Sequence, residues 1–401
     1  MPPPDYRHLT LLGLALAAST CAWAEGADDL RFRASVGLVH DSNLFRLDPG
    51  VNALTLIGRS SAAETVRITT LGANYNKAYS LQRVEFDLNY TDYKYQNFDY
   101  LSFAATNYLG AWRWSYTPHL YGNLSTSRNE TLNSFVDFQG FNQRNLRTDT
   151  NTRLDATYEL DANWRLGGGL LRNARKNAQQ LVQEGDYKLS SADAAVRYVL
   201  PSGSSAAYTV TSTDGTYLNR PVPSGGLNDN GFRQTDNDLQ LSWAISRDTS
   251  AILRAGHRSR THPNYPQRDF SGLTGGANLS WSFSPKSAVT AGWRRELDTF
   301  ETANSNFVQV DRFTIGPVWQ VSPKATVRLQ LEHASRDFRG SPGVFVTQRR
   351  DTTRDASISL DWQPFSFLAL SASLQNARRS SNIAGLDYAS NIVNVSAQFT
   401  Y

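Results

Sequence analysis

Apolar and polar residues alternate one by one along most of this chain, from about residue 30 to its end. The segment 388–401 shows it best, with Val393, Val395 and Phe399 in one phase and mostly hydroxyl or amide residues in the other. Successive side chains of a β-strand point to opposite faces, so this segment is predicted to be one strand with an apolar face. It exceeds the roughly 9–11 residues that a tilted strand needs to cross a bilayer.

The C-terminal half repeats pairs of such strands, and each pair is joined by a short turn. Turns are predicted at 246–249, 284–287, 321–324 and 363–365, where Pro or Asp favours a tight reversal. They recur about every 40 residues, with a long polar stretch between pairs. A β-propeller has a similar period, but its blades hold four short strands. Two long strands per repeat favour a barrel with short turns at one end and long loops at the other.

The N-terminal half follows the same plan with weaker turns, at 77–81, 116–118, 160–162 and 200–203. About eight short turns imply about 18 strands, and an even number places both chain ends on the periplasmic side. The prediction is an all-β fold, a transmembrane antiparallel up-and-down β-barrel. Residues 30–40 would pair with the last strand and remove the sheet edge. The location that follows is the bacterial outer membrane.

The first 24 residues are predicted to be a cleaved signal peptide. A basic start precedes an apolar stretch at 9–18 that is too short to span a bilayer, and 22–24 form a small-x-small cleavage site. Residues 25–401 would then form a single barrel domain with long extracellular loops. Cys21 also allows a lipoprotein reading, although the residues before it lack the usual leucine.

Composition supports a barrel. Charged residues make up 19% of the chain, hydrophobic ones 40% and aromatic ones 11%. This balance suits a wall in which half of each strand faces water and only a band faces lipid. After the N-terminus no apolar run is long enough for a membrane helix.

The two faces of the predicted wall differ in charge. Trp and Tyr residues of the apolar phase fall beside the short turns, where an interfacial girdle is expected. Charges on a lipid face cost roughly 2–4 kcal/mol at the midplane, so the charged phase must face the lumen, with more Arg than carboxylate. Two readings stay open, a salt-bridge network that braces the wall and a positive conduit for an anionic solute. The predicted lumen arginines are Arg113, Arg153, Arg197, Arg254, Arg294, Arg312 and Arg328.

The sequence offers little catalytic chemistry. The six histidines are scattered without metal-ligand spacing, and neither G-x-S-x-G, a P-loop nor G-x-G-x-x-G occurs. We therefore predict no enzyme, no cofactor, no metal and no nucleic-acid partner. The Asp-Asn clusters at 228–230 and 236–238 are read as loop chemistry in preference to a calcium site. Gly167, Gly168 and Gly169 are read as permitting a bend within a strand.

Two further segments could shape the mouth of the barrel. The aromatic run Tyr90, Tyr93, Tyr95, Phe98, Tyr100 and Phe103 is predicted to form the outer girdle, with sugar stacking at the mouth as the alternative. The loop 218–233 could be an ordinary exposed loop or could fold inward as a constriction.

The stretch that follows the first strand carries a family resemblance. Asp41, Asn43, Leu44, Phe45 and Arg46 lie in the sequence HDSNLFR. With the barrel pattern, this motif resembles the EpsL group of outer-membrane proteins, which are associated with exosortase-B extracellular polysaccharide clusters and are similar to BBP2-like barrel porins. The resemblance implies export of an exopolysaccharide together with other polysaccharide secretion components. It implies no catalytic residue.

Three functions are therefore expected from different classes. The first is an outer-membrane channel for exopolysaccharide export, and the others are a plugged structural or adhesive barrel and a general anion-selective porin. The closing aromatics Phe399 and Tyr401 resemble the element read by the outer-membrane assembly machinery. Outer-membrane lipid and that machinery are the remaining expected partners.

Overall fold

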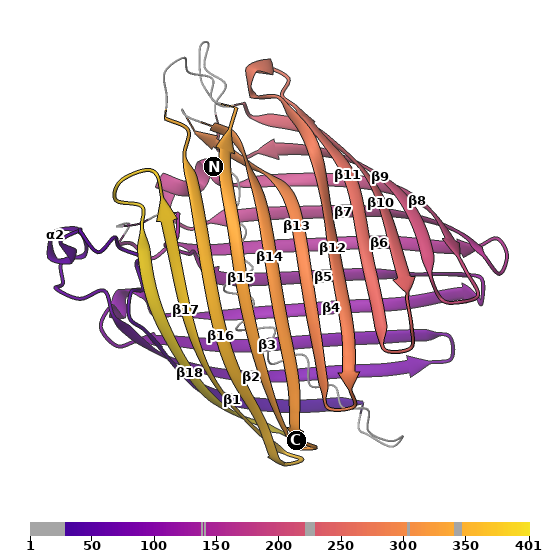
Figure 1. Ribbon diagram of the computed structural model, residues 1–401, viewed down its shortest axis with the longest axis horizontal. Helices are drawn as coiled ribbons and strands as arrows, with labels where there is room; N and C mark the ends of the chain where they lie inside the picture. The colour runs from indigo at the N-terminus through magenta and orange to yellow at the C-terminus, as the bar shows by residue number, and fades with distance from the viewer. Residues whose placement is uncertain (1–28, 138, 140–141, 221–228, 303–304, 341–346) are drawn as a thin grey trace.

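The computed structural model describes residues 29–137, 139, 142–220, 229–302, 305–340 and 347–401. The predicted signal peptide 1–24 lies outside these residues. The described chain forms one 18-stranded antiparallel sheet that closes on itself (Figure 1). No helix within these ranges is long and apolar enough to cross a bilayer.

The strands are β1 (Leu30–Asp41), β2 (Glu64–Tyr79), β3 (Gln82–Tyr95), β4 (Phe103–Thr117), β5 (Leu120–Leu132), β6 (Leu146–Glu159), β7 (Trp164–Asn177), β8 (Tyr187–Val199), β9 (Ser205–Tyr217), β10 (Gly231–Ala244), β11 (Thr249–Thr261), β12 (Phe270–Ser284), β13 (Ser287–Thr302), β14 (Ser305–Ser322), β15 (Ala325–Arg339), β16 (Arg350–Phe365), β17 (Leu368–Ser381) and β18 (Tyr388–Thr400). The short helices are α2 (Ala53–Ile57), η1 (Asp99–Leu101), η2 (Gln180–Gly185) and η3 (Pro266–Arg268).

The first and last strands close the barrel, as the sequence predicts. Their register runs from Arg33 opposite Thr400 to Asp41 opposite Ile392. Beyond it, the backbone N–H groups of Phe32 and Tyr401 each donate to the other's carbonyl, both at 2.8 Å. The predicted up-and-down topology is confirmed, because every other strand pairs with its neighbours in sequence.

The turns at the two ends of the barrel differ in length. At the end where the C terminus lies (Figure 1), strands are joined by turns of two to five residues, such as that between β12 and β13. At the opposite end the connections are longer, with the exception of that between β13 and β14, and they include α2 and η1 to η3. We call these the short-turn end and the loop end.

The outer face is apolar near the short-turn end. Many of the large outward side chains are exposed, among them Trp243, Trp281, Trp319 and Trp362 beside the short turns. This is the girdle position that the sequence predicts. On β16 the outward apolar series continues from Trp362 to Ala356, and the next outward residue toward the loops is Arg354. On this strand the apolar band therefore covers the short-turn half.

Two hairpins leave the wall at the loop end. Pairing between β12 and β13 stops at Gly275 and Arg295, although β13 stays paired with β14 as far as Thr302. Pairing between β4 and β5 stops likewise at Tyr108 and Arg128. The freed tips of β13–β14 and β5–β6 turn inward and build the mouth described next.

Candidate functional site: the mouth and lumen of the barrel

The motif after β1 organises the first loop and the barrel seam. Asp41 receives hydrogen bonds from the Ser390 hydroxyl on β18 at 2.5 Å and from the Asn43 backbone N–H at 2.9 Å. Its other oxygen pairs with Arg46 Nη1 at 2.8 Å. The Asn43 side chain donates to the carbonyls of Leu47 and Ala389, at 2.8 and 3.1 Å. The motif thus ties the seam between β1 and β18 to the loop.

Phe45 is the centre of an apolar cluster at the mouth. Its side chain is fully buried and lies 4.8 Å from the ring of Phe98 and 4.6 Å from that of Phe135, centroid to centroid. Leu47, Ile57 and Leu101 complete the buried set. The cluster joins three successive loops, because these residues come from the connections β1–β2, β3–β4 and β5–β6. Packing of this kind gives the mouth its own small core.

The connection between β5 and β6 crosses the mouth. Asp137 at its tip lies 3.1 Å from Arg336 of β15 and 3.5 Å from both Arg349 and Arg379 of the far wall. Strand β17, which carries Arg379, stands six places from β5 around the closed sheet. The Arg379 guanidinium also donates to the Val136 carbonyl at 2.7 Å. We call the described residues of this connection, 133–137, 139 and 142–145, the crossing loop.

The anchor of the crossing loop is a buried charge cluster. Side chains of Asp137 and Arg379 are 3% and 0% exposed. Burial alone would raise the pKa of Asp137, but the ion pairs with Arg336, Arg379 and Arg349 outweigh it and hold the pKa below its ordinary value. The Asp137 carboxylate is therefore charged at neutral pH. A buried charge is tolerated only when it is paired, as this one is.

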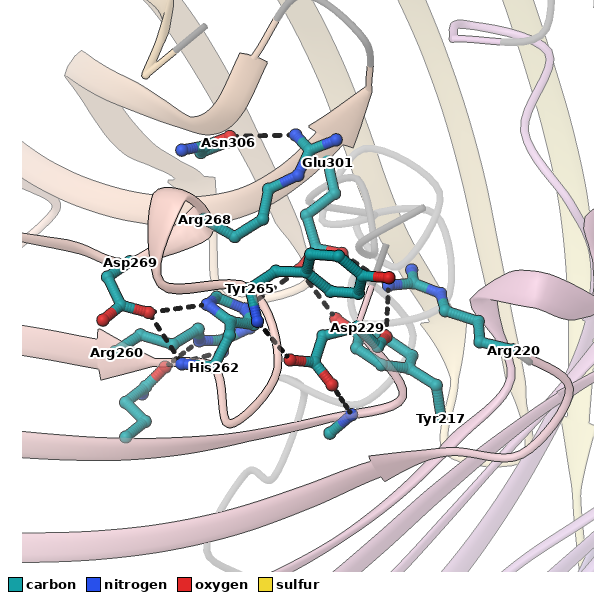
Figure 2. Close-up of polar contacts among 12 residues, drawn as sticks. Tyr217, Arg220, Asp229, Arg260, His262, Tyr265, Arg268, Asp269, Glu301 and Asn306 are labelled. Carbon is teal, nitrogen blue, oxygen red and sulfur yellow. Dashed lines mark hydrogen bonds and ion pairs between the residues drawn. The ribbon is translucent and has the colours of Figure 1, made fainter. Parts of the chain in front are cut away.

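A second buried charge cluster, which we call the latch, holds the β13–β14 tip inside the mouth (Figure 2). Glu301 pairs with Arg220 at 2.5 Å, and both side chains are 1% exposed. Tyr217 donates its hydroxyl to Glu301 at 3.3 Å, and His262 Nε2 lies 3.4 Å away. Arg258, which points inward from β11, donates to the Leu297 carbonyl at 2.7 Å. The tip thus lies against the inner face of β9 to β11.

The ends of the predicted loop 218–233 belong to this latch, while 221–228 lie outside the described residues. Asp229 is fully buried and accepts hydrogen bonds from the backbone N–H groups of Asn264 and Tyr265, at 2.7 and 3.1 Å. Its carboxylate therefore fastens the β11–β12 loop, which favours the loop-chemistry reading of 228–230. Within the described ranges no three acidic, His or Cys residues are grouped as metal ligands would be.

All seven predicted lumen arginines lie in the inward phase of their strands, and most have carboxylate partners. Ion pairs join Arg113 to Glu85, Arg153 to Asp193, Arg294 to Glu296, Arg312 to Glu332 and Arg328 to Asp361. The predicted arginine excess is thus largely offset by neighbouring carboxylates, as in the bracing reading. Arg254 instead donates to the Gln240 amide at 2.9 Å. Arg197 has no ion-pair partner within the described residues and is exposed to the lumen.

The inner wall nevertheless contains arginines directly opposite one another. Three such cross-strand pairs occur, Arg83 with Arg113, Arg165 with Arg197 and Arg294 with Arg312. Like charges in directly opposed positions destabilise a sheet. Arg83 and Arg113 share the single carboxylate Glu85, at 3.1 and 2.9 Å. Arg165, Arg294 and Arg312 each have a carboxylate of their own, whereas Arg197 has none within the described residues. Local positive charge therefore remains at Arg197 and where Arg83 and Arg113 share Glu85.

Two readings of the sequence need correction. In the aromatic run only Tyr90 has the outward position of a girdle, at 50% exposure. Tyr93 and Tyr95 point inward, with Tyr93 stacked on Phe103 at 4.5 Å, because they share the phase of the inward carboxylates of β3. The glycines of β7 lie in a strand that pairs on both sides without a register shift. A Cβ at Gly169 would lie 2.5 Å from the Arg153 guanidinium, so this glycine makes room for an ion pair.

Replacing Phe45 with Ala is expected to loosen the mouth without opening the wall. A fully buried Phe→Ala change costs about 3–5 kcal/mol, and here the loss falls on the three loops that meet at this ring. We expect faster proteolysis of the loops between 42 and 145 in the folded barrel. The matched control is Phe86→Ala, which truncates a lipid-facing ring on β3. Equal proteolysis of the two variants would contradict the assignment.

Fold and surface together define the class. A closed 18-stranded barrel with an apolar outer band and a charged interior is an outer-membrane β-barrel of the porin type. The family model described as "Putative beta-barrel porin 2" matches residues 246–401. No curated protein matches the chain.

Solved structures show the same fold. The outer membrane protein OpdK of Pseudomonas aeruginosa superposes with a TM-score of 0.52 at 10% identity, covering 93% of this chain and 99% of its own. A BenF-like porin from Pseudomonas fluorescens Pf-5 gives 0.54 at 10% identity over the same shares. OccK2 (OpdF) of P. aeruginosa, solved in complex with glucuronate, gives 0.53 at 13% identity, covering 93% of this chain and 98% of its own.

Proposed function

We propose that this protein is a channel, not an enzyme, and that it passes small anionic solutes across the outer membrane through a mouth narrowed by the crossing loop. The observation that carries the proposal is the set of opposed arginines on the inner wall. Such pairs cost stability, and a positive wall between low-dielectric surfaces concentrates anions. Two fold neighbours were solved with vanillate and with glucuronate, which are both carboxylates and suitable first test solutes.

Selectivity in planar bilayers tests this proposal. We expect the wild-type barrel to prefer anions in a salt gradient. Arg197→Glu with Arg254→Glu should lower the anion-to-cation permeability ratio by about twofold or more. Among the described residues these two inward arginines have no carboxylate partner, so their reversal breaks no ion pair there. The control is Arg247→Glu with Lys286→Glu, which makes the same change in net charge at the short turns.

A cation-selective wild-type channel, or an equal loss of selectivity in the control, would contradict an anion pathway. Absence of any conductance in every variant would favour the plugged structural or adhesive barrel instead.

Exopolysaccharide export is a second candidate, which rests on the resemblance of the Asp41–Arg46 motif to the EpsL group. A polymer would require the crossing loop to leave its anchor, whereas a small solute would not. Block of the conductance by an acidic polysaccharide but not by neutral dextran would favour export. Block by neither, with permeation of glucuronate, would favour the small-solute channel.

A further inference from the structure

A row of basic side chains faces outward on three neighbouring strands, just above the apolar band. His333, Arg354 and Arg378 stand directly opposite one another on β15, β16 and β17. The row ends at Phe313 on one side and at Ala389 on the other. Their outward direction follows from the phase they share with exposed apolar residues such as Leu331, Ile358 and Leu374.

This row lacks the counter-charges that several other outward arginines have. Arg128, Arg233 and Arg295 each have a carboxylate within about 3 Å, namely Glu130, Asp214 and Asp311. Neither Arg354 nor Arg378 has an ion-pair partner within the described residues, and both are exposed. Directly opposed like charges are unfavourable in a sheet, so an external anion would relieve the repulsion.

The residues above the row complete a polar site. Ser335, Thr352 and Ser380 form the next outward row toward the loop end, again directly opposite one another. Beyond them Arg350 and Arg339 share one carboxylate, Asp337, at 3.6 and 3.0 Å. A row of hydroxyls thus lies between two basic rows. Opposed Cα atoms are about 4.5–5.5 Å apart, so two guanidinium groups can reach one phosphate, which arginine binds through paired hydrogen bonds.

The position of the site indicates that its ligand is a lipid and not a free ion. Immediately toward the membrane are Leu331, Ala356 and the polar Asn376, and then the apolar Leu329, Ile358 and Leu374, all on the outer face. A molecule with a phosphate in the basic row would lay its acyl chains along these apolar side chains. The loop end is the extracellular end of the barrel, so the row lies at the height of the outer-leaflet headgroups.

We propose that the outer face of β15 to β17 binds a phosphorylated glycolipid of the outer leaflet, with Arg354 and Arg378 holding a phosphate and Ser335, Thr352 and Ser380 donating to it. The site is independent of the lumen and of what passes through it. It would fix the lipid at one point of the barrel wall and neutralise the opposed arginines there.

Binding of lipid A to the full-length barrel in detergent tests the proposal. We compare wild type, Arg354→Gln with Arg378→Gln, and the control Arg172→Gln with Arg233→Gln, which removes two outward arginines that have no basic residue opposite. The probes are diphosphorylated lipid A, its dephosphorylated form and inorganic phosphate, followed by native mass spectrometry. We expect at least about tenfold weaker binding of diphosphorylated lipid A to the Arg354/Arg378 variant only.

Thermal unfolding gives an independent readout. Without lipid, the Arg354/Arg378 variant should be as stable as wild type or more so, because a repulsion is removed. Added lipid A should stabilise the wild type and the control but not this variant, since only a bound ligand raises the unfolding temperature. Equal lipid binding by all three proteins, equal binding of dephosphorylated lipid A, or equally tight binding of inorganic phosphate would overturn the proposal.

Discussion

Replacing Asp137 with Ala is expected to raise the single-channel conductance about twofold or more, because the crossing loop loses its hold on the far wall. The change leaves Arg336, Arg349 and Arg379 without the carboxylate that they share. An unpaired buried charge costs about 3–5 kcal/mol, and the arginines regain water only if the loop moves away. Planar-bilayer recording measures the effect.

The matched control is Asp193→Ala, which removes an inner-wall carboxylate bound to Arg153 at 2.9 Å but touches no loop. A conductance rise of the same size in Asp193→Ala would contradict the conclusion that the crossing loop narrows the channel.

Acid provides a second arm of this test. Since the pKa of Asp137 is lowered, its stabilisation is full above the ordinary carboxyl pKa of about 3.9 and is lost as the pH falls through the lower value in the folded protein. Wild type should therefore open only below about pH 3.9, whereas the variant is open at neutral pH.

Deleting Phe399 to Tyr401 is expected to abolish insertion into the outer membrane. The deletion removes the pairs of Phe399 and Thr400 with β1, together with both hydrogen bonds between Tyr401 and Phe32. It would leave the seam unpaired at the short-turn end, where unsatisfied backbone groups in lipid cost several kcal/mol each. Heat-modifiable migration of the membrane fraction on gels measures insertion.

The control for this deletion is Phe367→Ala, which removes an exposed aromatic ring at a short turn without shortening a strand. It should insert normally. A normal heat-modifiable barrel from the truncated chain would mean that neither closure nor assembly depends on the last three residues.

Much of the wall could be predicted from the sequence, because the alternation along each strand shows which residues face lipid and which face the lumen. Because side chains alternate with a period of two, Trp362 faces lipid and its neighbour Asp361 faces the lumen, where it pairs with Arg328. Turn residues such as Pro285 and Pro323 mark the strand ends locally. The number of strands follows from these turns, so the 18-stranded barrel needed no knowledge of distant contacts.

The mouth could not be predicted in the same way, because its contacts join distant parts of the chain. Asp137 and Arg379 are 242 residues apart, and the local sequence pattern around either residue does not indicate the other as its partner. A usable signal did exist for Tyr93 and Tyr95, whose phase on β3 matches Glu85 and not Phe86. The sequence pointed to the Asp41–Arg46 motif only through its resemblance to a known family. The contact of Asp41 with Ser390 is seen only in the folded chain.

The anchor of the crossing loop also sets an order of assembly. The loop leaves the ribosome well before its partners Arg336, Arg349 and Arg379, which lie in the last quarter of the chain. Contacts of such long sequence separation form late, because the intervening chain must first be ordered. We expect the mouth to stay open until the last strands are in place, so that a growing barrel has an unobstructed interior and becomes narrowed only when it is finished.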